Sequence, residues 1–399
     1  MIFTRRDFLK AASLVALAPT VPAFLARAAR AAAPRPDARV LVVIQLDGGN
    51  DGINTIVPFK DEGYAKYRKA LRLPADRLIK LNDGLGFHPS LAVFGKLFEA
   101  GHLAVVQGVG YPNPNRSHFE SMAIWHTARL DPEGHGDSGW LGRALDAAPR
   151  PADGTPASLF VGAEVPPVAL RGRRVAASAL ARLEDFLLAL DDPRPAFAGP
   201  GEGDGVTAFV RRSVLDAYAT AGRMAEVART GGGPLRHPTT ALAERLSLIA
   251  RLLKAGSGAR IFYTTQGGYD THGAQEGVHP GLLTDLAGAV KEFLDGLAAA
   301  KLADRVAVLC FSEFGRRVQE NASAGTDHGT AGPVFLAGPK VKGGLVGETP
   351  SLLDLDGGDL KMGIDFRRVY ATVLEDWLGL PSEKALSAGF ERLPLFKTV

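Results

Sequence analysis

Short apolar runs alternate with longer amphipathic segments along most of the chain. Runs rich in valine, isoleucine and leucine that end at turn residues are typical of buried strands, and five of them span 40–46, 103–109, 260–265, 305–311 and 334–338. Apolar residues recur at helical spacing in five other segments, at 89–100, 117–127, 240–254, 282–300 and 366–378. Strands that alternate with helices predict an α/β fold, with a mostly parallel sheet covered by helices on both faces.

This alternation is interrupted between about 145 and 235. Proline, glycine and aspartate cluster at 149–156 and again at 193–205, which indicates exposed loops. The residues between these clusters and after them predict two short strands and one helix, at 158–161, 168–170 and 207–229. We interpret 145–235 as a variable insertion or cap on a single domain that spans 38–399.

The first 33 residues are typical of an export signal. Adjacent Arg5 and Arg6 precede a moderately apolar stretch, and small residues follow it up to Ala31. This order is that of a secretory signal, and the paired arginines are typical of twin-arginine (Tat) export. The apolar stretch contains two prolines and is too short to span a bilayer. We therefore expect a Tat signal peptide at 1–33, the Tat translocon as a partner, no permanent membrane span, and a periplasmic or extracellular location.

Charge and cysteine content exclude two classes of protein. The chain has 46 Lys and Arg against 43 Asp and Glu, but residues 1–31 hold five basic residues and only one acidic residue. The remainder is slightly acidic, so it has no basic excess that would attract nucleic acid. The single cysteine, Cys310, excludes an intrachain disulfide, and its apolar surroundings in the sequence predict a buried, unreactive thiol.

Acidic residues flanked by glycine follow three predicted strands, and histidines accompany two of the polar motifs. The candidate ligands are Asp47, Asp270, His272, Glu313, Asp327 and His328. Because the carboxyl ends of parallel strands meet at one edge of a sheet, these side chains are expected to lie together, where a cation would offset the repulsion between carboxylates. The pattern predicts a divalent metal such as zinc, calcium or manganese. In the alternative interpretation the aspartates cap turns, Glu313 pairs with Arg316 or Arg317, and His328 donates to a backbone carbonyl.

Ser117 precedes the helix predicted at 117–127 and has Glu120 three residues later, which is the pattern of a helix cap. A helix start also offers unpaired amides and positive potential. Ser117 is therefore a candidate nucleophile or part of an anion site, with simple capping as the alternative.

Five motifs occur together in a fixed order. They are Leu46 to Asn54, Arg116-Ser117-His118-Phe119, Gly268 to His272 with Gln275, Ser312 to Arg316, and Asp327-His328-Gly329. In combination they resemble the domain-of-unknown-function family 1501, Tat-exported bacterial proteins, over nearly all of the mature chain. That family in turn resembles the alkaline phosphatase and sulfatase superfamily. The resemblance implies an alkaline phosphatase-like α/β sandwich that hydrolyses phosphate or sulfate esters at one or two divalent metals.

The resemblance also implies roles for individual residues. It places metal ligands at Asp47, Asp270, His272 and His328. Ser117 corresponds to the nucleophile that begins a helix. Glu313 occupies the acidic position of an Asp-His pair whose histidine is replaced by Phe314 in this chain.

We therefore expect an exported metal-dependent hydrolase that acts on a small-molecule or polymer ester of phosphate or sulfate. Arg116 or Arg316 would clamp the non-bridging oxygens of the ester. The replaced histidine favours an alternative, an exported binding or surface-assembly protein that keeps the fold without catalysis. A third possibility is a carbohydrate-ester hydrolase in which His118 or His328 is the base for Ser117.

Overall fold

The computed structural model describes residues 38–131, 136, 138–148, 156–175, 178–181 and 240–398. The predicted signal peptide at 1–33, the predicted helix at 207–229 and most of the insertion at 145–235 lie outside these ranges. Within the described ranges, no helix is both long enough and apolar enough to cross a membrane.

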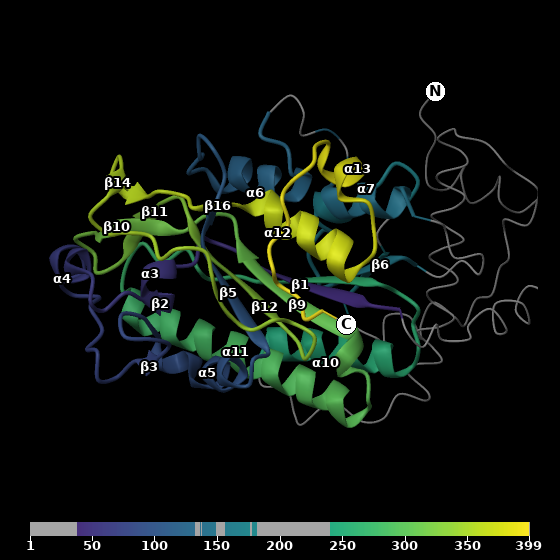
Figure 1. Ribbon diagram of the computed structural model, residues 1–399, viewed down its shortest axis with the longest axis horizontal. Coiled ribbons are helices and arrows are strands. Elements are labelled where there is room, and N and C mark those ends of the chain that lie inside the picture. Colours follow the sequence, from purple (N-terminus) through teal and green to yellow (C-terminus); the bar gives the residue numbers. More distant parts are fainter. Residues whose placement is uncertain are drawn as a thin grey trace, which may run out of the picture.

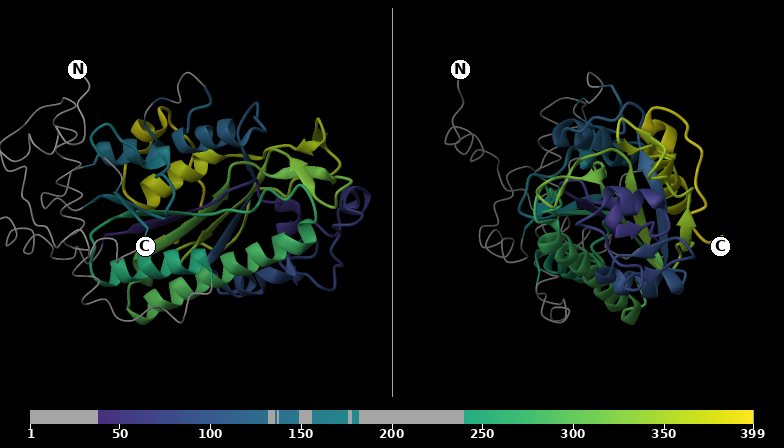
Figure 2. Two further views of the ribbon diagram at one scale, coloured as in Figure 1. Left: turned by 180° about the vertical axis from the view of Figure 1, so that it is seen from behind. Right: turned by 90° about the vertical axis from the view of Figure 1, so that its left-hand side faces the viewer.

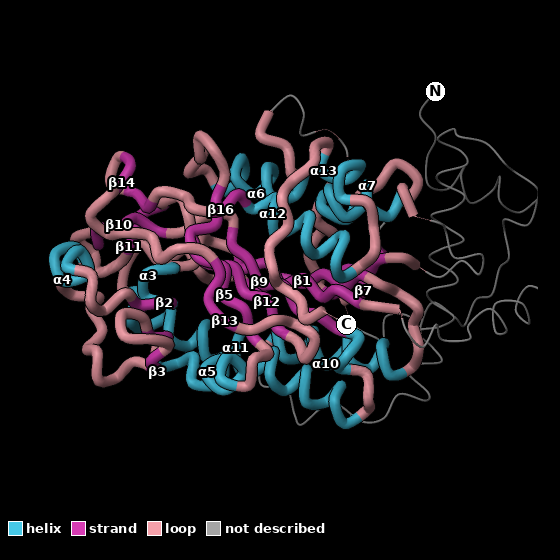
Figure 3. Tube along the Cα trace, in the orientation of Figure 1, coloured by secondary structure: helices cyan, strands magenta, loops and turns pink. Residues whose placement is uncertain are grey.

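In the described part of the chain, a nine-stranded sheet runs through the middle of the molecule (Figures 1 and 3). Its strands are β1 (Val40–Leu46), β5 (Leu103–Gly110), β6 (Ser158–Val161), β7 (Ser178–Leu180), β8 (Ile261–Gln266), β9 (Val306–Ser312), β12 (Gly332–Ala337), β13 (Gly344–Val346) and β16 (Ile364–Asp365). Their order is β13-β5-β12-β9-β1-β8-β6-β7, and β16 also pairs with β5. The pairings are parallel except those of β12 with β5 and β9. The prediction of a mostly parallel sheet is confirmed.

Strand β12 runs against its neighbours because no helical crossover leads into it. Between β9 and β12 the chain forms the small hairpin of β10 (Arg316–Glu320) and β11 (Thr326–His328). Parallel strands need a long crossover, usually a helix, whereas antiparallel neighbours are joined by shorter connections. The hairpin pairs Arg316 with His328, so it brings two candidate site residues together.

Helices cover both faces of the sheet (Figures 1 and 2). One face carries α5 (Ala92–Glu99), α10 (Ala241–Lys254) and α11 (Gln275–Ala299), and the other carries α6 (His118–Thr127), α7 (Trp140–Asp146), α12 (Phe366–Thr372) and α13 (Ser382–Leu386). Side chains of β1 alternate between the two layers: Val42 and Ile44 join the core beneath α10 and α11, whereas Leu41 and Val43 join the core beneath α6 and α12. Burial on both faces explains why this strand is a continuous apolar run. Cys310 is buried in the first of these cores, as predicted.

Smaller elements surround the end of the sheet at which β1, β8 and β9 terminate. They are α3 (Gly52–Thr55), α4 (Glu62–Tyr67), β2 (Ile56–Val57), β3 (Ile79–Lys80), β4 (Gly86–Phe87), β14 (Leu355–Asp356) and β15 (Asp359–Leu360). The described ranges also contain four turns of 3₁₀ or π helix, at Pro89–Leu91, Val168–Leu170, Ala303–Arg305 and Val373–Trp377. The candidate site lies among the loops at this end.

Two elements differ from the sequence prediction. The pattern predicts a strand at 168–170, but Val168–Leu170 is a 3₁₀ helix that directly follows two prolines, which lack the N–H groups that a sheet ladder uses. The helix predicted to begin at 282 begins at Gln275 and passes through Pro280. Burial of side chains before and after this proline, including His279, outweighs its helix-breaking tendency.

Candidate metal centre

The loops that follow β1, β8 and β9 meet at one edge of the sheet. β1 lies between β8 and β9 and is parallel to both, so the three loops begin side by side. The Tyr269 N–H donates to the carbonyl of Asp47 (3.1 Å), and the Gly48 N–H donates to the Glu313 carboxylate (3.0 Å). Gly48 has a φ of +118°, and a Cβ there would lie 2.3 Å from the Asp270 nitrogen, so this close approach requires glycine.

Three histidines surround the carboxylate of Asp270 through their Nε2 atoms. Nε2 of His272 and Nε2 of His328 lie 3.0 Å and 3.2 Å from Asp270 Oδ1, and 2.9 Å from each other. His118 Nε2 lies 3.6 Å from Asp270 Oδ2. We call these four residues, His118, Asp270, His272 and His328, the histidine cluster.

Each histidine of the cluster also contacts an oxygen acceptor through Nδ1. His118 Nδ1 lies 2.7 Å from Glu313 Oε1, His272 Nδ1 lies 3.3 Å from Asp327 Oδ1, and His328 Nδ1 lies 2.8 Å from the carbonyl oxygen of Arg116. A neutral imidazole that donates from Nδ1 presents a lone pair at Nε2, which is how second contacts orient histidines toward a metal. Lone pairs that face one another and a carboxylate repel unless a proton or a cation lies between them.

The donor atoms of the cluster fit a cation. Donors bound at about 2.1 Å in a tetrahedral site lie about 3.4 Å apart. The separations of 2.9–3.6 Å between Asp270 and each histidine, and between His272 and His328, bracket this value. The candidate ligand atoms of three residues, His118, Asp270 and His328, all lie within 4.8 Å of one another, and His272 contacts two members of this group. His118 Nε2 is buried and has no hydrogen-bond partner. Three imidazole nitrogens and one carboxylate suit zinc, whereas calcium prefers oxygen ligands alone.

Arg316 fixes the carboxylate at the centre of the cluster. The guanidinium is buried, and its three nitrogens donate to Gly49 O (2.7 Å), Thr326 O (2.7 Å) and Asp270 Oδ1 (2.6 Å). Burial acts to raise the pKa of Asp270, but the hydrogen bond and charge of Arg316 outweigh it and the pKa is lowered. Asp270 is therefore ionised at neutral pH, and Arg316 has no donor nitrogen without a protein acceptor.

Arg116 and Ser117 lie at the start of α6 but outside the cluster. The Arg116 side chain forms an ion pair with Asp359, while its backbone carbonyl accepts from His328. Ser117 is exposed and precedes α6, yet its hydroxyl makes no capping hydrogen bond to the helix. The Arg116 side chain, which the sequence predicts to clamp the ester, thus contacts Asp359, and only the Arg116 backbone carbonyl contacts the cluster.

Asp47 belongs to a different set of contacts at the same edge. Gln45 Nε2 donates to Asp47 Oδ1, and Gln45 Oε1 in turn contacts His126 Nε2 (2.7 Å) and the hydroxyl of Tyr263. Burial raises the pKa of Asp47 to about 6 and lowers the pKa of His126 to about 4. His126 is therefore neutral at pH 7, and Asp47 takes up a proton in mildly acidic solution.

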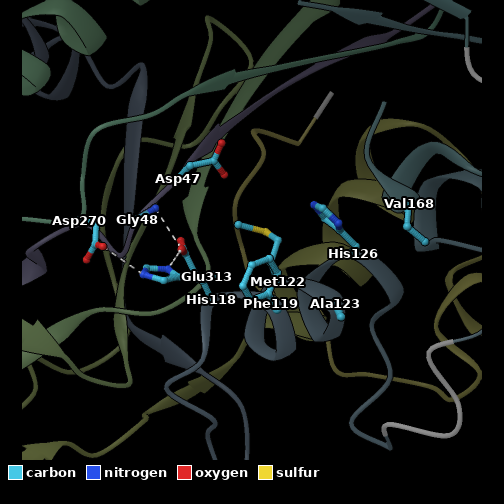
Figure 4. Close-up of a pocket in the computed structure, with 10 residues that line it drawn as sticks. All are labelled: Asp47, Gly48, His118, Phe119, Met122, Ala123, His126, Val168, Asp270 and Glu313. Atoms are coloured by element: carbon cyan, nitrogen blue, oxygen red, sulfur yellow. Dashed lines mark hydrogen bonds and ion pairs between the residues drawn. The ribbon is translucent and has the colours of Figure 1, made fainter. Parts of the chain in front are cut away.

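A cavity of about 580 Å³ joins these two groups of polar residues (Figure 4). It is lined by Asp47, Gly48, His118, Phe119, Met122, Ala123, His126, Val168, Asp270 and Glu313. His118 and His126 face it from α6, two helical turns apart, with Met122 between them. The predicted residues Arg116, Ser117, Arg316, Asp327, His272 and His328 are not part of this lining.

Sequence reasoning did not assign His118 and His126 to this arrangement. The sequence pattern gives His118 only the role of a base, although its contacts match those of His272 and His328. The available signal was spacing: His118, Met122 and His126 recur every four residues and so share one face of a helix. Which ring nitrogen faces which oxygen depends on three separate loops and has no local sequence signal.

Several solved structures are similar to this chain at low identity. The PsFucS1 sulfatase from Pseudoalteromonas sp. has a TM-score of 0.42 and 9% identity, covering 95% of this chain and 78% of that chain. The C-terminal periplasmic domain of EcEptC from Escherichia coli, in complex with Zn, has a TM-score of 0.37 and 8% identity, covering 77% and 75%. The alkaline phosphatase from the Antarctic bacterium TAB5 has a TM-score of 0.30 and 12% identity, covering 76% and 92%. Similarity of this degree leaves the chemistry to be argued from the residues themselves.

A protein family also matches the chain over most of its length. No curated protein matches the chain. Residues 38–388 match the family described as protein of unknown function (DUF1501), which covers most of the sequence. The motifs quoted above therefore occur within one family domain, and the chain belongs to the DUF1501 family.

Proposed function

We propose that the protein is a metal-dependent hydrolase of phosphate or sulfate esters, with zinc held by the histidine cluster. The observation that carries the proposal is the orientation of three imidazoles, each fixed at Nδ1 by an oxygen and each directing Nε2 at Asp270. A divalent cation bound there would polarise the ester and stabilise the charge that develops on its oxygens.

The residues around the cluster have separate tasks in this proposal. Glu313 and Asp327 hold the rings of His118 and His272, and Arg316 holds Asp270 ionised and in place. Asp47 lies in the same cavity with a pKa raised to about 6, so in mildly acidic solution it can deliver a proton to the leaving oxygen of the ester. The cavity between Asp47 and Asp270 receives the ester.

Ser117 is the proposed nucleophile, as the family resemblance implies; it is exposed and does not line the cavity, but it directly precedes His118, which does. Its hydroxyl makes no capping bond, and the next residue, His118, belongs to the cluster. Ser117→Ala should then reduce turnover at least about 100-fold without reducing zinc content. Undiminished turnover in this variant would assign the attack to water and leave Ser117 as an exposed residue at a helix start.

The central experiment combines metal analysis with hydrolysis assays. Purified protein should contain about one zinc per chain, hydrolyse 4-nitrophenyl phosphate or 4-nitrophenyl sulfate, lose activity with a chelator and regain it with zinc. The His272→Ala and His328→Ala variants should lose both metal and activity. Protein that takes up no zinc, calcium or manganese, or that stays inactive on both esters after metal loading, contradicts the proposal.

One feature favours a second candidate, an exported binding protein that keeps the metal but lacks turnover. Phe314 packs against the rings of His118 and His328, with centroids 4.9 Å and 5.0 Å apart, and so fills the flank of the cluster. A second metal on this flank would need a polar ligand there. Full zinc occupancy without hydrolysis of either ester would support this candidate over the hydrolase.

Export by the Tat pathway is part of the proposal and rests on the sequence of residues 1–33. Replacing Arg5 and Arg6 together by lysine should retain the precursor in the cytoplasm. Cell fractionation with an epitope tag at the C-terminus measures this. Unchanged export of the double variant would exclude the Tat translocon as the partner.

A further inference from the structure

The cavity beside the histidine cluster has one apolar wall. Asp270, His118 and Glu313 lie at one end of the cavity, whereas Phe119, Met122, Ala123 and Val168 extend from the middle toward the other end (Figure 4). Three of these apolar residues come from α6, and Val168 comes from the 3₁₀ helix Val168–Leu170. A ligand held at the charged end would therefore lie along an apolar surface.

Phe119 is the most exposed large apolar residue of this wall. Its side chain is 89% exposed, although it lines the same cavity as the half-buried Met122. Single exposed apolar residues are common on proteins, but an exposed aromatic ring that continues into a cavity with other apolar residues is typical of a ligand site.

Packing of α6 does not require Phe119. The helix is anchored on its opposite side by Ile124 and Trp125, which are buried. The Trp125 ring stacks on Phe311 and Phe366, with centroids 4.9 Å and 4.5 Å apart. The helix therefore has apolar side chains on two faces, of which one serves the core and the other faces the cavity.

We propose that the wall formed by Phe119, Met122 and Val168 binds the organic group of the ester, and that this group contains a ring with a flat apolar face. Aromatic side chains stack on such faces, and aromatic and saturated rings share this chemistry. The inference rests on the proposed function, because it assumes that the acidic group of the ester occupies the end of the cavity near Asp270. It excludes short, open-chain alcohols as the preferred leaving group.

Binding of phosphonates tests this inference without requiring turnover. Zinc-loaded protein is titrated by calorimetry with methylphosphonate, phenylphosphonate and cyclohexylphosphonate, which share the anionic group and differ in the organic group. Burying one ring against the wall should tighten binding about tenfold relative to methylphosphonate. If only phenylphosphonate binds more tightly, the organic group of the ester contains an aromatic ring. If cyclohexylphosphonate binds equally tightly, the wall accepts an aromatic or a saturated ring.

Variants at the wall separate this inference from the proposed function. Phe119→Ala should remove most of the tenfold preference and leave methylphosphonate binding unchanged, whereas Phe119→Tyr should keep the preference. Leu353→Ala is the matched control, because Leu353 is 52% exposed and does not line the cavity. Equal binding of methyl and ring phosphonates by the unaltered protein overturns the inference alone. Failure to bind any of the phosphonates contradicts the proposed function and the inference with it.

Discussion

Two groups of polar side chains lie in the loops at the same edge of the sheet, and they differ in how their hydrogen bonds are satisfied. The first, the buried network, consists of Asn50, Asp51, Arg68, Gln275 and His279, all of which are buried. Asp51 accepts from Arg68 Nη1 (2.5 Å), Arg68 Nη2 (2.9 Å) and Gln275 Nε2 (2.6 Å). No buried side-chain nitrogen or oxygen of these five residues lacks a hydrogen-bond partner, and the opposite charges of Asp51 and Arg68 are paired.

The histidine cluster has the opposite arrangement. Its Nε2 atoms and the oxygens of Asp270 face one another, and Asp270 is about half exposed. Arg316 pairs with the Asp270 carboxylate (2.6 Å), but the imidazole nitrogens gathered around this carboxylate repel one another unless a proton or a cation lies between them. The buried network therefore serves the fold, whereas the cluster has the arrangement that the proposed zinc site requires.

The two groups are connected. Gln275 Oε1 accepts from Thr271 (2.9 Å) and from Thr326 (2.7 Å), and these threonines precede His272 and His328 closely in sequence. The buried network therefore positions the two segments that carry His272 and His328. This explains why Asp51 and Gln275 accompany the polar motifs of the sequence although they do not contact the cavity.

The largest effect should come from breaking the buried network. Arg68→Ala leaves Asp51 charged, buried and unpaired, which should lower the free energy of unfolding by about 3–5 kcal/mol. Denaturant unfolding of the metal-free protein measures this. Arg392→Ala is the control, because the Arg392 pair with Asp376 is half exposed and should contribute less than about 1 kcal/mol. Similar losses in the two variants would show that the network is not a structural element.

Acid should affect histidines of the two groups in opposite directions. Burial lowers the pKa of His279 to about 4. The unfolded chain therefore binds a proton at this histidine at a higher pH than the folded chain does. As the pH falls from about 6.5 to 4, this difference should lower the free energy of unfolding by about 3 kcal/mol. The hydrogen bond to Glu313 raises the pKa of His118, so its contribution is present below about pH 6.5 and is lost as the pH rises.

Unfolding of metal-free protein between pH 4 and 8 tests this contrast. The His279→Gln variant should show a weaker loss of stability in acid, and the His118→Gln variant should show a steeper one. A change of the same sign in both variants would mean that the two histidines do not differ in the way the structure indicates.

The sequence predicts the sheet and its polar edge because these depend on local patterns. Continuous apolar runs indicate strands buried on both faces, and the acids that follow them, such as Asp47 and Glu313, must then emerge together. The contacts of individual side chains are less predictable. Whether Glu313 faces a metal or the Nδ1 of His118 depends on how the loop after β9 meets α6, which involves residues 195 positions apart.

Local helix propensity does not predict the first turns of α11, on which the site depends. Pro280 and its neighbouring glycines disfavour a helix at 275–281, yet α11 begins at Gln275 because that side chain and His279 are buried in the network. The early start of α11 thus depends on polar contacts that also position His272. The pattern of apolar residues does not reveal these contacts.

Removing one ligand of the cluster should weaken metal binding without changing the stability of the metal-free protein. His328→Ala should weaken zinc binding at least about 100-fold, while the unfolding midpoint of metal-free protein stays within about 1 °C, because the lost ring faces other acceptors and is partly exposed. Competition with a chromophoric chelator measures the affinity. His102→Ala, at a histidine outside the cluster and the network, should change neither quantity. If His328→Ala destabilises the metal-free protein, the cluster would serve the fold in the same way as the buried network.

The smallest effect should come from the acids that hold the rings, and it should follow their distances and burial. Glu313 is buried, lies 2.7 Å from His118 Nδ1 and also accepts from Gly48, whereas Asp327 is 56% exposed and lies 3.3 Å from His272 Nδ1. A short, buried contact restrains a ring more than a long, hydrated one. Glu313→Gln should therefore weaken zinc binding nearly 100-fold and Asp327→Asn only about tenfold. If Asp327→Asn weakens zinc binding as much as His328→Ala does, then Asp327 is itself a metal ligand and does not merely orient His272.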